Sequence, residues 1–199
     1  MDLKLLAWGL RRNRLPLPRL WLFTDDQRLR DPRASVAGLP RGQAGVVLRH
    51  DHDPERAALG RELARICRER RLVLVVAGDA RLATALKAGV HLRGGYWPGS
   101  IRPRGVVTSS AHTVPDLKRA ARAGAGLAFL SPAFATASHA SAPGLGPLRW
   151  GAMVRLAMAG HHGGGGMRLA ALGGVNGANI RRLPSRVCAA AGAIGALSH

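Results

Sequence analysis

Two glycines and an asparagine follow one of the apolar runs of the sequence, and their spacing suits the binding of a phosphate. Gly173 and Gly174 come directly after the run 168–172, and Asn176 stands where a helix should begin. Glycine lets a backbone approach a ligand closely, and the free N–H groups at a helix start attract anions. A phosphate-binding turn is favoured over a tight turn that merely needs glycine. On this interpretation, Gly174→Asp should abolish phosphate binding and leave the fold intact.

A hydroxyl-rich segment forms a second candidate site. It runs from 131 to 143 after another apolar run, and it contains Thr136, Ser138 and His139. Hydroxyl and imidazole groups suit contacts with phosphate or diphosphate, and the composition suits a lid over a site. An ordinary surface loop explains the same composition equally well.

The segment 50–53 reads His-Asp-His-Asp and gathers four possible metal ligands. Adjacent side chains point in different directions, however, and Asp53 before Pro54 has the features of a helix N-cap. The sequence therefore favours a helix start over a metal centre at this place.

Other polar side chains give weaker signals. Asp25 and Asp26 are candidates for acid–base chemistry or cation binding, with solvated carboxylates as the alternative. His91 lies within an apolar run, which favours a place in the interior, and His112 stands just before a predicted helix.

Eight short apolar runs alternate with helical patterns along the chain. As candidate strands we take 20–24, 44–49, 72–77, 89–92, 105–109, 126–130, 168–172 and 192–197. As candidate helices we take 53–67, 82–87, 113–121, 148–158 and 176–183. This alternation predicts a small (β/α)₈ TIM barrel, with a doubly wound open sheet as the alternative.

The predicted barrel is a single domain over residues 1–199, with 1–19 as an N-terminal extension. Residues 3–14 favour an extra helix, and the end of the sequence soon after the eighth run predicts that the last outer helix is missing. Segments 26–42 and 93–104 show little helical pattern.

A barrel places its active site where the strands end, so only residues just after strands are candidates. Asp79 and Arg93–Gly95 meet this test as well, whereas the glycine run 163–166 precedes a strand and reads as a connector.

The composition narrows the class of partner. The net charge is +19, but all basic residues except Lys4, Lys87 and Lys118 are arginine, and they are spread along the chain without an aromatic stacking set. Nucleic acid is therefore an unlikely partner, and a phosphorylated small molecule is expected.

No apolar run is long enough for a membrane helix. The two cysteines, Cys67 and Cys188, form no disulfide framework, which favours the cytoplasm.

Six blocks of the sequence, in order, resemble motifs of the thiamine phosphate synthase/TenI superfamily. The resemblance covers about residues 20–197, nearly the whole chain. Its blocks are Trp-Leu-Phe-Thr-Asp at 21–25, Val-Leu-Arg at 47–49, Gly-Val-His-Leu at 89–92, Ser-Ala-His-Thr at 110–113, Ser-Pro-Ala-Phe-Ala-Thr-Ala-Ser at 131–138, and Leu-Gly-Gly-Val-Asn at 172–176 with a further Asn at 179.

The resemblance implies a (β/α)₈ barrel that joins an aminopyrimidine diphosphate to a thiazole phosphate with release of diphosphate. It implies that Mg²⁺ and basic residues balance the charge of the leaving group. It implies that four residues contact the diphosphate, namely Arg49, Ser110, Thr136 and Ser138. It implies that the glycine pair Gly173 and Gly174, with Asn176 beside it, holds the thiazole phosphate.

The sequence departs from the family at positions that carry the chemistry. The two metal-binding carboxylates become Gly78 and Tyr96, and two lysines become Asp51 and His139. The histidine of the tautomerase branch falls at Pro132. The family resemblance thus implies bound Mg²⁺, whereas the loss of the two carboxylates that would bind it makes Mg²⁺ binding doubtful in this chain. The substitute carboxylates that remain open are Asp25, Asp26, Asp51 and Asp79.

Three hypotheses follow. The chain is a divergent thiamine phosphate synthase, which is the expected function, with His139 in place of a catalytic lysine. Alternatively, it is a repurposed TenI-like barrel that binds thiazole or thiamine phosphates. The least favoured is a basic nucleic-acid-binding protein. A homo-oligomer is left open.

Overall fold

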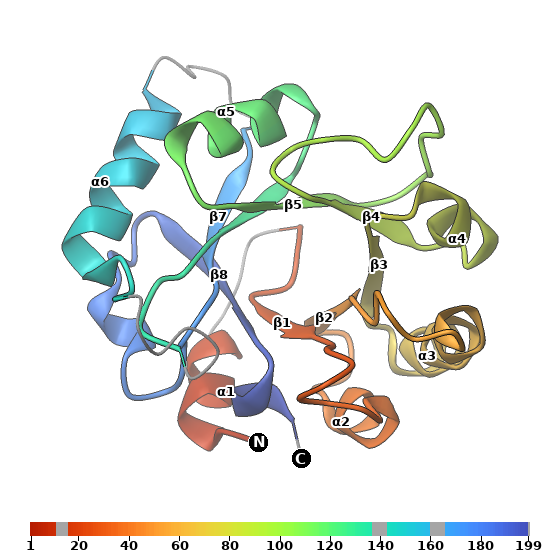
Figure 1. Cartoon of the computed structure of the whole chain (residues 1–199). Helices are drawn as coiled ribbons and strands as arrows, with labels where there is room; N and C mark the ends of the chain where they lie inside the picture. Colours follow the sequence, from red (N-terminus) through yellow and green to blue (C-terminus); the bar gives the residue numbers. More distant parts are fainter. Residues whose placement is uncertain (11–15, 137–142, 160–165, 199) are drawn as a thin grey trace.

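The computed structural model describes residues 1–10, 16–136, 143–159 and 166–198, and its strands form a closed parallel barrel (Figure 1). Neighbouring strands pair in parallel, and Leu20 of the first strand lies opposite Ala191 of the last, which closes the sheet. The predicted TIM barrel is therefore confirmed, and the doubly wound open sheet is wrong. The strands are β1 Leu20–Phe23, β2 Ala44–Leu48, β3 Val73–Ala77, β4 Gly89–Leu92, β5 Val107–Ala111, β6 Leu127–Leu130, β7 Arg168–Ala171 and β8 Cys188–Ala193.

Helices surround the barrel on the outside (Figure 1). They are α1 Leu3–Gly9, α2 Arg33–Gly38, α3 Arg56–Arg70, α4 Ala80–Ala85, α5 Val114–Arg122 and α6 Gly146–Met158, with short 3₁₀ helices η2 Ile180–Arg182 and η3 Gly195–Leu197. The connection from β4 to β5 has no helix among its residues, all of which are described, as its sequence predicts.

Several boundaries differ from the prediction for local reasons. Strand β8 begins at Cys188, four residues before the predicted start, because the small apolar residues 188–191 pair with β7 and β1. Helix α3 begins at Arg56 with Glu55 at the N-cap, so the predicted cap at Asp53 is wrong; Asp53 instead accepts a hydrogen bond from the backbone N–H of Glu55. Helix α2 lies in a segment for which we predicted no helix.

The glycine turn after β7 leads into a shorter helix than predicted. Asn176 accepts hydrogen bonds from the backbone N–H groups of Ala178 and Asn179, which forms a turn, and only η2 follows. Asn179, not Asn176, is its N-cap residue.

Alternate strand residues fill the inside of the barrel. Trp21 and Phe129 lie 5.7 Å apart and Phe23 and Phe129 lie 4.8 Å apart between ring centroids, each pair edge to face. Such pairs add to the stabilisation from burial of their apolar surface. The inside is thus a packed core below the strand ends, which leaves chemistry to the residues above it.

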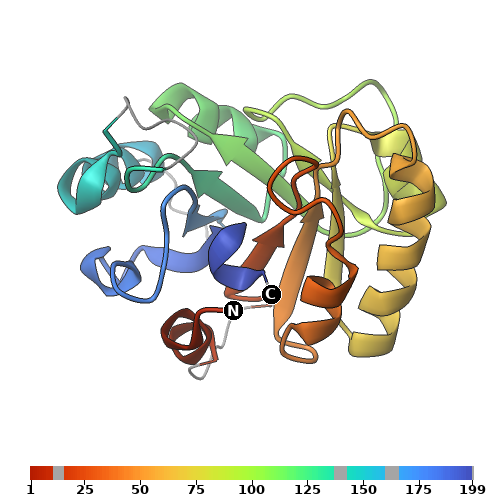
Figure 2. The ribbon, with the colours of Figure 1, turned by 60° about the horizontal axis from the view of Figure 1, so that its bottom comes forward.

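Helix α1 covers the outside of the barrel next to β1 and the segments that follow β7 and β8 (Figures 1 and 2). Its Leu5 and Trp8 are buried in the same outer apolar layer as Leu20. The backbone N–H of Asp2 donates to the Ala196 carbonyl at 2.7 Å, and the Asp2 carboxylate accepts from the Gly177 N–H at 2.7 Å. The predicted extra helix therefore lies where the last outer helix of such a barrel would be.

Both cysteines are buried and not paired with each other. Burial raises the pKa of each thiol to about 12. Neither is therefore a nucleophile, because the reactive species of cysteine is the thiolate.

Candidate active site

The carboxyl ends of the strands bring the predicted site residues to one mouth of the barrel. Arg49 follows β2, Ser110 lies near the end of β5, and the pair Gly173–Gly174 follows β7. Each is reached by a strand of the same closed parallel sheet, so all open toward the same side. The sequence prediction that these residues share one end of the fold is consistent with the topology.

A pocket of about 370 Å³ opens beside the ends of β1 and β2. Its lining is strongly polar and comprises Asp25, Asp26, Gln27, Arg28, Arg49, Asp51 and His52. The backbone N–H of Arg49 donates to the hydroxyl of Thr24 at 2.9 Å, which fixes the start of the loop that carries it.

The carboxylate of Asp25 is committed to its own loop. It accepts hydrogen bonds from the backbone N–H groups of Gln27 and Arg28 and from the Arg28 guanidinium at 2.8 Å. Partial burial acts to raise its pKa, but these contacts outweigh burial and lower the pKa to about 2. Asp25 is therefore an ionised structural acceptor at neutral pH and not a proton donor.

An arginine pair surrounds Asp51 at the border of this pocket. Arg93, which follows β4, contacts Asp51 at 2.7 Å, and Arg56 at the start of α3 lies 3.4 Å from the other carboxylate oxygen. Arg56 also donates to the carbonyl of Ala77 at 2.6 Å. Arg93 thus reaches from β4 over the end of β3 to the loop after β2.

The backbone at Gly78 makes this reach possible. A Cβ atom at position 78 would lie 2.9 Å from Nε and 3.1 Å from Cζ of Arg93, so a side chain there would displace the guanidinium. Gly78 also has a φ of 66°, in the left-handed region that favours glycine. The position at which the family resemblance implies a metal-binding carboxylate is therefore filled by the Arg93 side chain.

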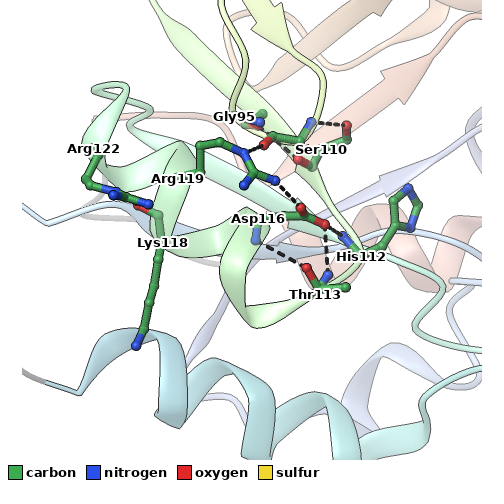
Figure 3. Close-up of polar contacts among 10 residues, drawn as sticks. Gly95, Ser110, His112, Thr113, Asp116, Lys118, Arg119 and Arg122 are labelled. Carbon is green, nitrogen blue, oxygen red and sulfur yellow. Dashed lines mark hydrogen bonds and ion pairs between the residues drawn. The ribbon is translucent and has the colours of Figure 1, made fainter.

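The loop that carries Arg93 is fixed to β5 and α5 (Figure 3). The backbone N–H groups of Gly94 and Gly95 donate to the hydroxyls of Ser110 at 3.3 Å and Ser109 at 3.0 Å. The Arg119 guanidinium donates to the Gly94 carbonyl at 2.6 Å and pairs with Asp116. Asp116 in turn closes the predicted capping box with Thr113 at the start of α5.

Tyr96, at the second position where the resemblance implies a metal-binding carboxylate, has a different environment. Its ring lies under the Arg119 guanidinium, 4.2 Å from the ring centroid, and the side chain is 63% exposed. Tyr96 therefore binds the Arg119 guanidinium and helps to fix the loop, and it offers no carboxylate to a metal ion.

Ser110 keeps a donor for a ligand. Its oxygen accepts the Gly94 N–H, while the hydroxyl proton is available, because a serine hydroxyl both donates and accepts. The side chain is half-buried at the mouth, so its hydroxyl can be reached by a ligand.

The turn at Gly173 and Gly174, where we predict phosphate binding, has a backbone that requires glycine. Both residues have positive φ, 88° and 64°, and the amide of Asn179 donates to the Gly174 carbonyl at 2.8 Å. Among the residues that the structure describes, the N–H groups of Gly173, Gly174 and Val175 have no hydrogen-bond partner. Asn176 lies in the same turn, but its own N–H is bonded to Asn179.

The structure changes the expectation for Gly174→Asp. A Cβ atom at Gly174 would lie 2.2 Å from the Ala135 carbonyl oxygen, and φ at this residue is positive. The substitution would therefore push away the segment after β6, contrary to the expectation that it leaves the fold intact.

The hydroxyl-rich segment is described only in part. Thr136 is half-buried in the segment after β6, whereas Ser138 and His139 lie outside the described residues. Most of the glycine run 163–166 lies outside them as well. His112 is exposed and its Nδ1 lies 3.0 Å from the Ser131 carbonyl.

The histidines near the site have structural surroundings. His50 is buried between the Thr24 hydroxyl, 2.9 Å from Nδ1, and the Arg30 carbonyl. His91 is buried inside the barrel with Nδ1 2.8 Å from the Thr108 hydroxyl, as predicted. Burial, together with the positive charges of Arg49 and Arg93, lowers the pKa of His91 to about 3.

The residues present do not fit a bound Mg²⁺. In the described part of the chain, no three His, Cys, Asp or Glu side chains are grouped so that they could hold a metal ion. The four substitute carboxylates have other partners. Asp25 pairs with Arg28, Asp51 with Arg93 and Arg56, Asp26 accepts the His52 N–H at 3.2 Å, and Asp79 is the N-cap of α4 through the Leu82 N–H at 2.9 Å. Guanidinium groups beside a carboxylate repel a cation from it.

Comparison with known proteins gives the family. The family model described as thiamine monophosphate synthase matches residues 20–196 of this chain. A protein of Aquifex aeolicus (strain VF5) named "Putative thiamine-phosphate synthase 2" is 30% identical over 141 residues, which are 66% of this chain and 76% of that protein. The chain belongs to the thiamine phosphate synthase/TenI family.

Solved structures agree on the fold. The thiamine phosphate pyrophosphorylase of Pyrococcus furiosus superposes with a TM-score of 0.68 at 22% identity, covering 89% of this chain and 85% of that one. A structure described as native KDPGal gives 0.57 at 16% identity over 92% and 84% of the two chains. At these identities the likeness concerns the barrel alone. Within the described residues, no helix has the length and apolarity that crossing a bilayer requires.

Proposed function

We propose that this chain is a thiamine phosphate synthase, joining an aminopyrimidine diphosphate to a thiazole phosphate. The observation that carries the proposal is the arrangement of two anion-binding sets on one barrel mouth. Arg49, after β2, and Ser110, near the end of β5, form the proposed set for the diphosphate. The N–H groups of Gly173, Gly174 and Val175, which have no hydrogen-bond partner among the described residues, form the set after β7. Two phosphorylated substrates that react with each other need two such sets facing one space.

In the proposed reaction, the bond between the pyrimidine methylene carbon and the diphosphate oxygen breaks. Its electron pair leaves with the diphosphate, and the ring nitrogen of the thiazole then forms a bond to the methylene carbon. Negative charge grows on the departing oxygen, so cationic groups at that place lower the barrier. Arg49 and Ser110 are proposed to hold the diphosphate, with Thr136 and Ser138 as further hydroxyl contacts to it. His139 replaces a lysine of the family in that segment.

The thiazole phosphate is assigned to the glycine turn after β7. The N–H groups of Gly173, Gly174 and Val175 have no hydrogen-bond partner among the described residues, so they can donate to a phosphate. Barrels of this kind commonly bind phosphate after the seventh strand. Helix η2 behind the turn is short, so backbone N–H groups rather than a helix dipole supply the attraction.

Formation of thiamine phosphate from the two precursors tests the proposal. We expect product from the wild-type protein, and a loss of about 100-fold in kcat/KM for Arg49→Gln and for Ser110→Ala, as for other groups that stabilise charge in a transition state. Arg68→Gln, an exposed arginine in the last turn of α3, is the matched control and should keep full activity.

The carboxylate losses favour one competing function, a barrel that binds thiazole or thiamine phosphates without joining them. In that case folded protein would be stabilised by thiamine phosphate but would form no product. This outcome would contradict the proposed synthase.

A further inference from the structure

We infer that Arg93 takes the part of the divalent cation in this chain, so that the site binds the diphosphate through guanidinium groups and without Mg²⁺. The inference rests on the proposed function for the identity of the diphosphate. It concerns a residue to which neither the sequence motifs nor the family resemblance assigns a role.

The first argument is the place of the side chain. The guanidinium of Arg93 lies directly over Gly78, where any side chain would collide with it. A carboxylate at position 78 and an arginine in this conformation exclude each other. The glycine and the arginine therefore form a matched pair, since the loss of the acidic group creates the space that the cation fills.

The second argument is the local charge. Asp51 is 22% exposed and is flanked by Arg93 and Arg56, while Arg49 borders the same pocket. Two guanidinium groups thus contact the Asp51 carboxylate, and Arg49 adds a third positive charge at the pocket that Asp51 also lines. On the β1 side, Asp25 is neutralised by Arg28, and Asp26 accepts a hydrogen bond from the His52 N–H. Asp79, the N-cap of α4, is the other carboxylate next to β3. Arg49, Arg56 and Arg93 still outnumber Asp51 and Asp79 by one positive charge, which favours an anion.

The third argument is that Arg93 has donors left for a ligand. A guanidinium carries five N–H donors, and the Asp51 contact uses Nη2. The side chain is 58% exposed at the mouth, so the remaining donors are open to solvent. The planar fork of arginine matches two phosphate oxygens at once, which suits a diphosphate better than a single point charge.

The fourth argument is that the base of the side chain is held in place before a ligand arrives. The carbonyl of Arg93 accepts the Tyr96 N–H at 3.1 Å, and the next residue is tied to Ser110 and to Arg119. Ser110, a proposed diphosphate contact, thus supports the backbone beside Arg93 directly. Arg49 and Arg93 follow β2 and β4, so both stand at the carboxyl ends of the strands.

Calorimetric titration with inorganic pyrophosphate tests the inference without any need for turnover. We expect the wild-type protein to bind pyrophosphate in excess EDTA, and added Mg²⁺ not to strengthen binding. Arg93→Gln should weaken binding by about 10-fold to 100-fold, the range for a lost charge-assisted contact. Arg93→Lys should restore only part of it, because lysine lacks the fork. Arg68→Gln should bind as the wild type does.

A second variant moves Arg93 without removing its charge. Gly78→Ala adds a Cβ atom where the guanidinium lies, so it should weaken pyrophosphate binding while all arginines remain. Circular dichroism confirms that each variant is folded. Binding that needs Mg²⁺, or unchanged binding by Arg93→Gln, would overturn the inference. An equal loss in Arg68→Gln would do so too, since it would reveal attraction by net charge alone.

The outcome separates this inference from the proposed function. Pyrophosphate binding in EDTA without formation of thiamine phosphate would support the role of Arg93 and contradict the synthase. Formation of thiamine phosphate only with Mg²⁺ would support the synthase and contradict the role of Arg93.

Discussion

At the scale of single residues, the site shows how one change of sequence alters the chemistry of its neighbours. With glycine at position 78, the end of β3 has room for the Arg93 side chain, and Asp51 then becomes the partner of two arginines. Each contact is local, and together they put a guanidinium at the position where the family resemblance implies a carboxylate. Below them lies His91, which must remain uncharged because it is buried and has cations above it.

The buried histidine gives a prediction for the pH dependence of stability. Because the folded pKa of His91 is about 3, the unfolded chain binds a proton near pH 6.5 that the folded protein does not. The stability is therefore fully present above pH 6.5 and falls as the pH is lowered toward 3. This single group should cost about 2 kcal/mol between pH 7.5 and pH 5.0.

Urea unfolding at both pH values measures this effect. In His91→Gln, the free energy of unfolding should depend less steeply on pH than in the wild type, whereas His52→Gln, an exposed control, should keep the wild-type slope. Equal slopes for the wild type and His91→Gln would show that His91 is not buried in its neutral form.

At the scale of elements, the loop after β4 is the feature that makes the site. It has no helix to hold it, so its position depends on contacts with β5 and α5. Arg119 provides two of them, the hydrogen bond to the Gly94 carbonyl and the stacking on Tyr96, and its ion pair with Asp116 of α5 holds the guanidinium in place. The loop is therefore fixed through a side chain of the next helix.

Removal of this side chain should loosen the loop and leave the barrel intact. Arg119→Ala is expected to weaken pyrophosphate binding about tenfold, since a lost charge-assisted contact has this scale, with a smaller effect on the melting temperature. Arg122→Ala, one turn later on α5 and exposed, is the control. If both variants bound pyrophosphate equally well, Arg119 would have no positioning role.

The same elements show what a sequence allows one to predict. Strands buried on both sides, such as 73–77, and the capping box at Thr113 have strong local signals, and both are confirmed. Helix α2 and the start of β8 depend on distant partners, through packing on α3 and pairing with β7, so their local patterns are weak.

The residues of the candidate site also differ in how far the sequence alone predicts them. Gly173, Gly174, Arg49 and Ser110 stand in motifs and are placed at the mouth, as expected. Arg93 was placed at the functional end by its position after a strand, but its role depends on contacts with Asp51 and Gly78, which are 42 and 15 residues away. A sequence without the fold does not show such pairs.

At the scale of the whole molecule, the barrel is closed by chain segments from both ends. Helix α1 begins beside residues that follow β7 and β8 and packs on β1, so the beginning of the chain completes the outer layer (Figure 2).

The packing of α1 on the barrel can be tested by truncation of one buried side chain of this helix. Leu5 is fully buried, so Leu5→Ala should lower the free energy of unfolding by about 2–5 kcal/mol, the usual cost of such a cavity. Leu3 on the same helix is 77% exposed, and Leu3→Ala should change the stability by less than about 0.5 kcal/mol. Equal effects of the two substitutions in chemical denaturation would show that α1 does not seal the barrel.

The most direct test of the whole account follows both products of the proposed reaction in one vessel. Purified protein is mixed with the aminopyrimidine diphosphate and the thiazole phosphate in excess EDTA, and thiamine phosphate and pyrophosphate are measured over time. The account predicts that both appear in equal amounts and that Arg93→Gln suppresses both. Absence of thiamine phosphate from folded protein, with or without added Mg²⁺, would contradict it, as would release of pyrophosphate without thiamine phosphate.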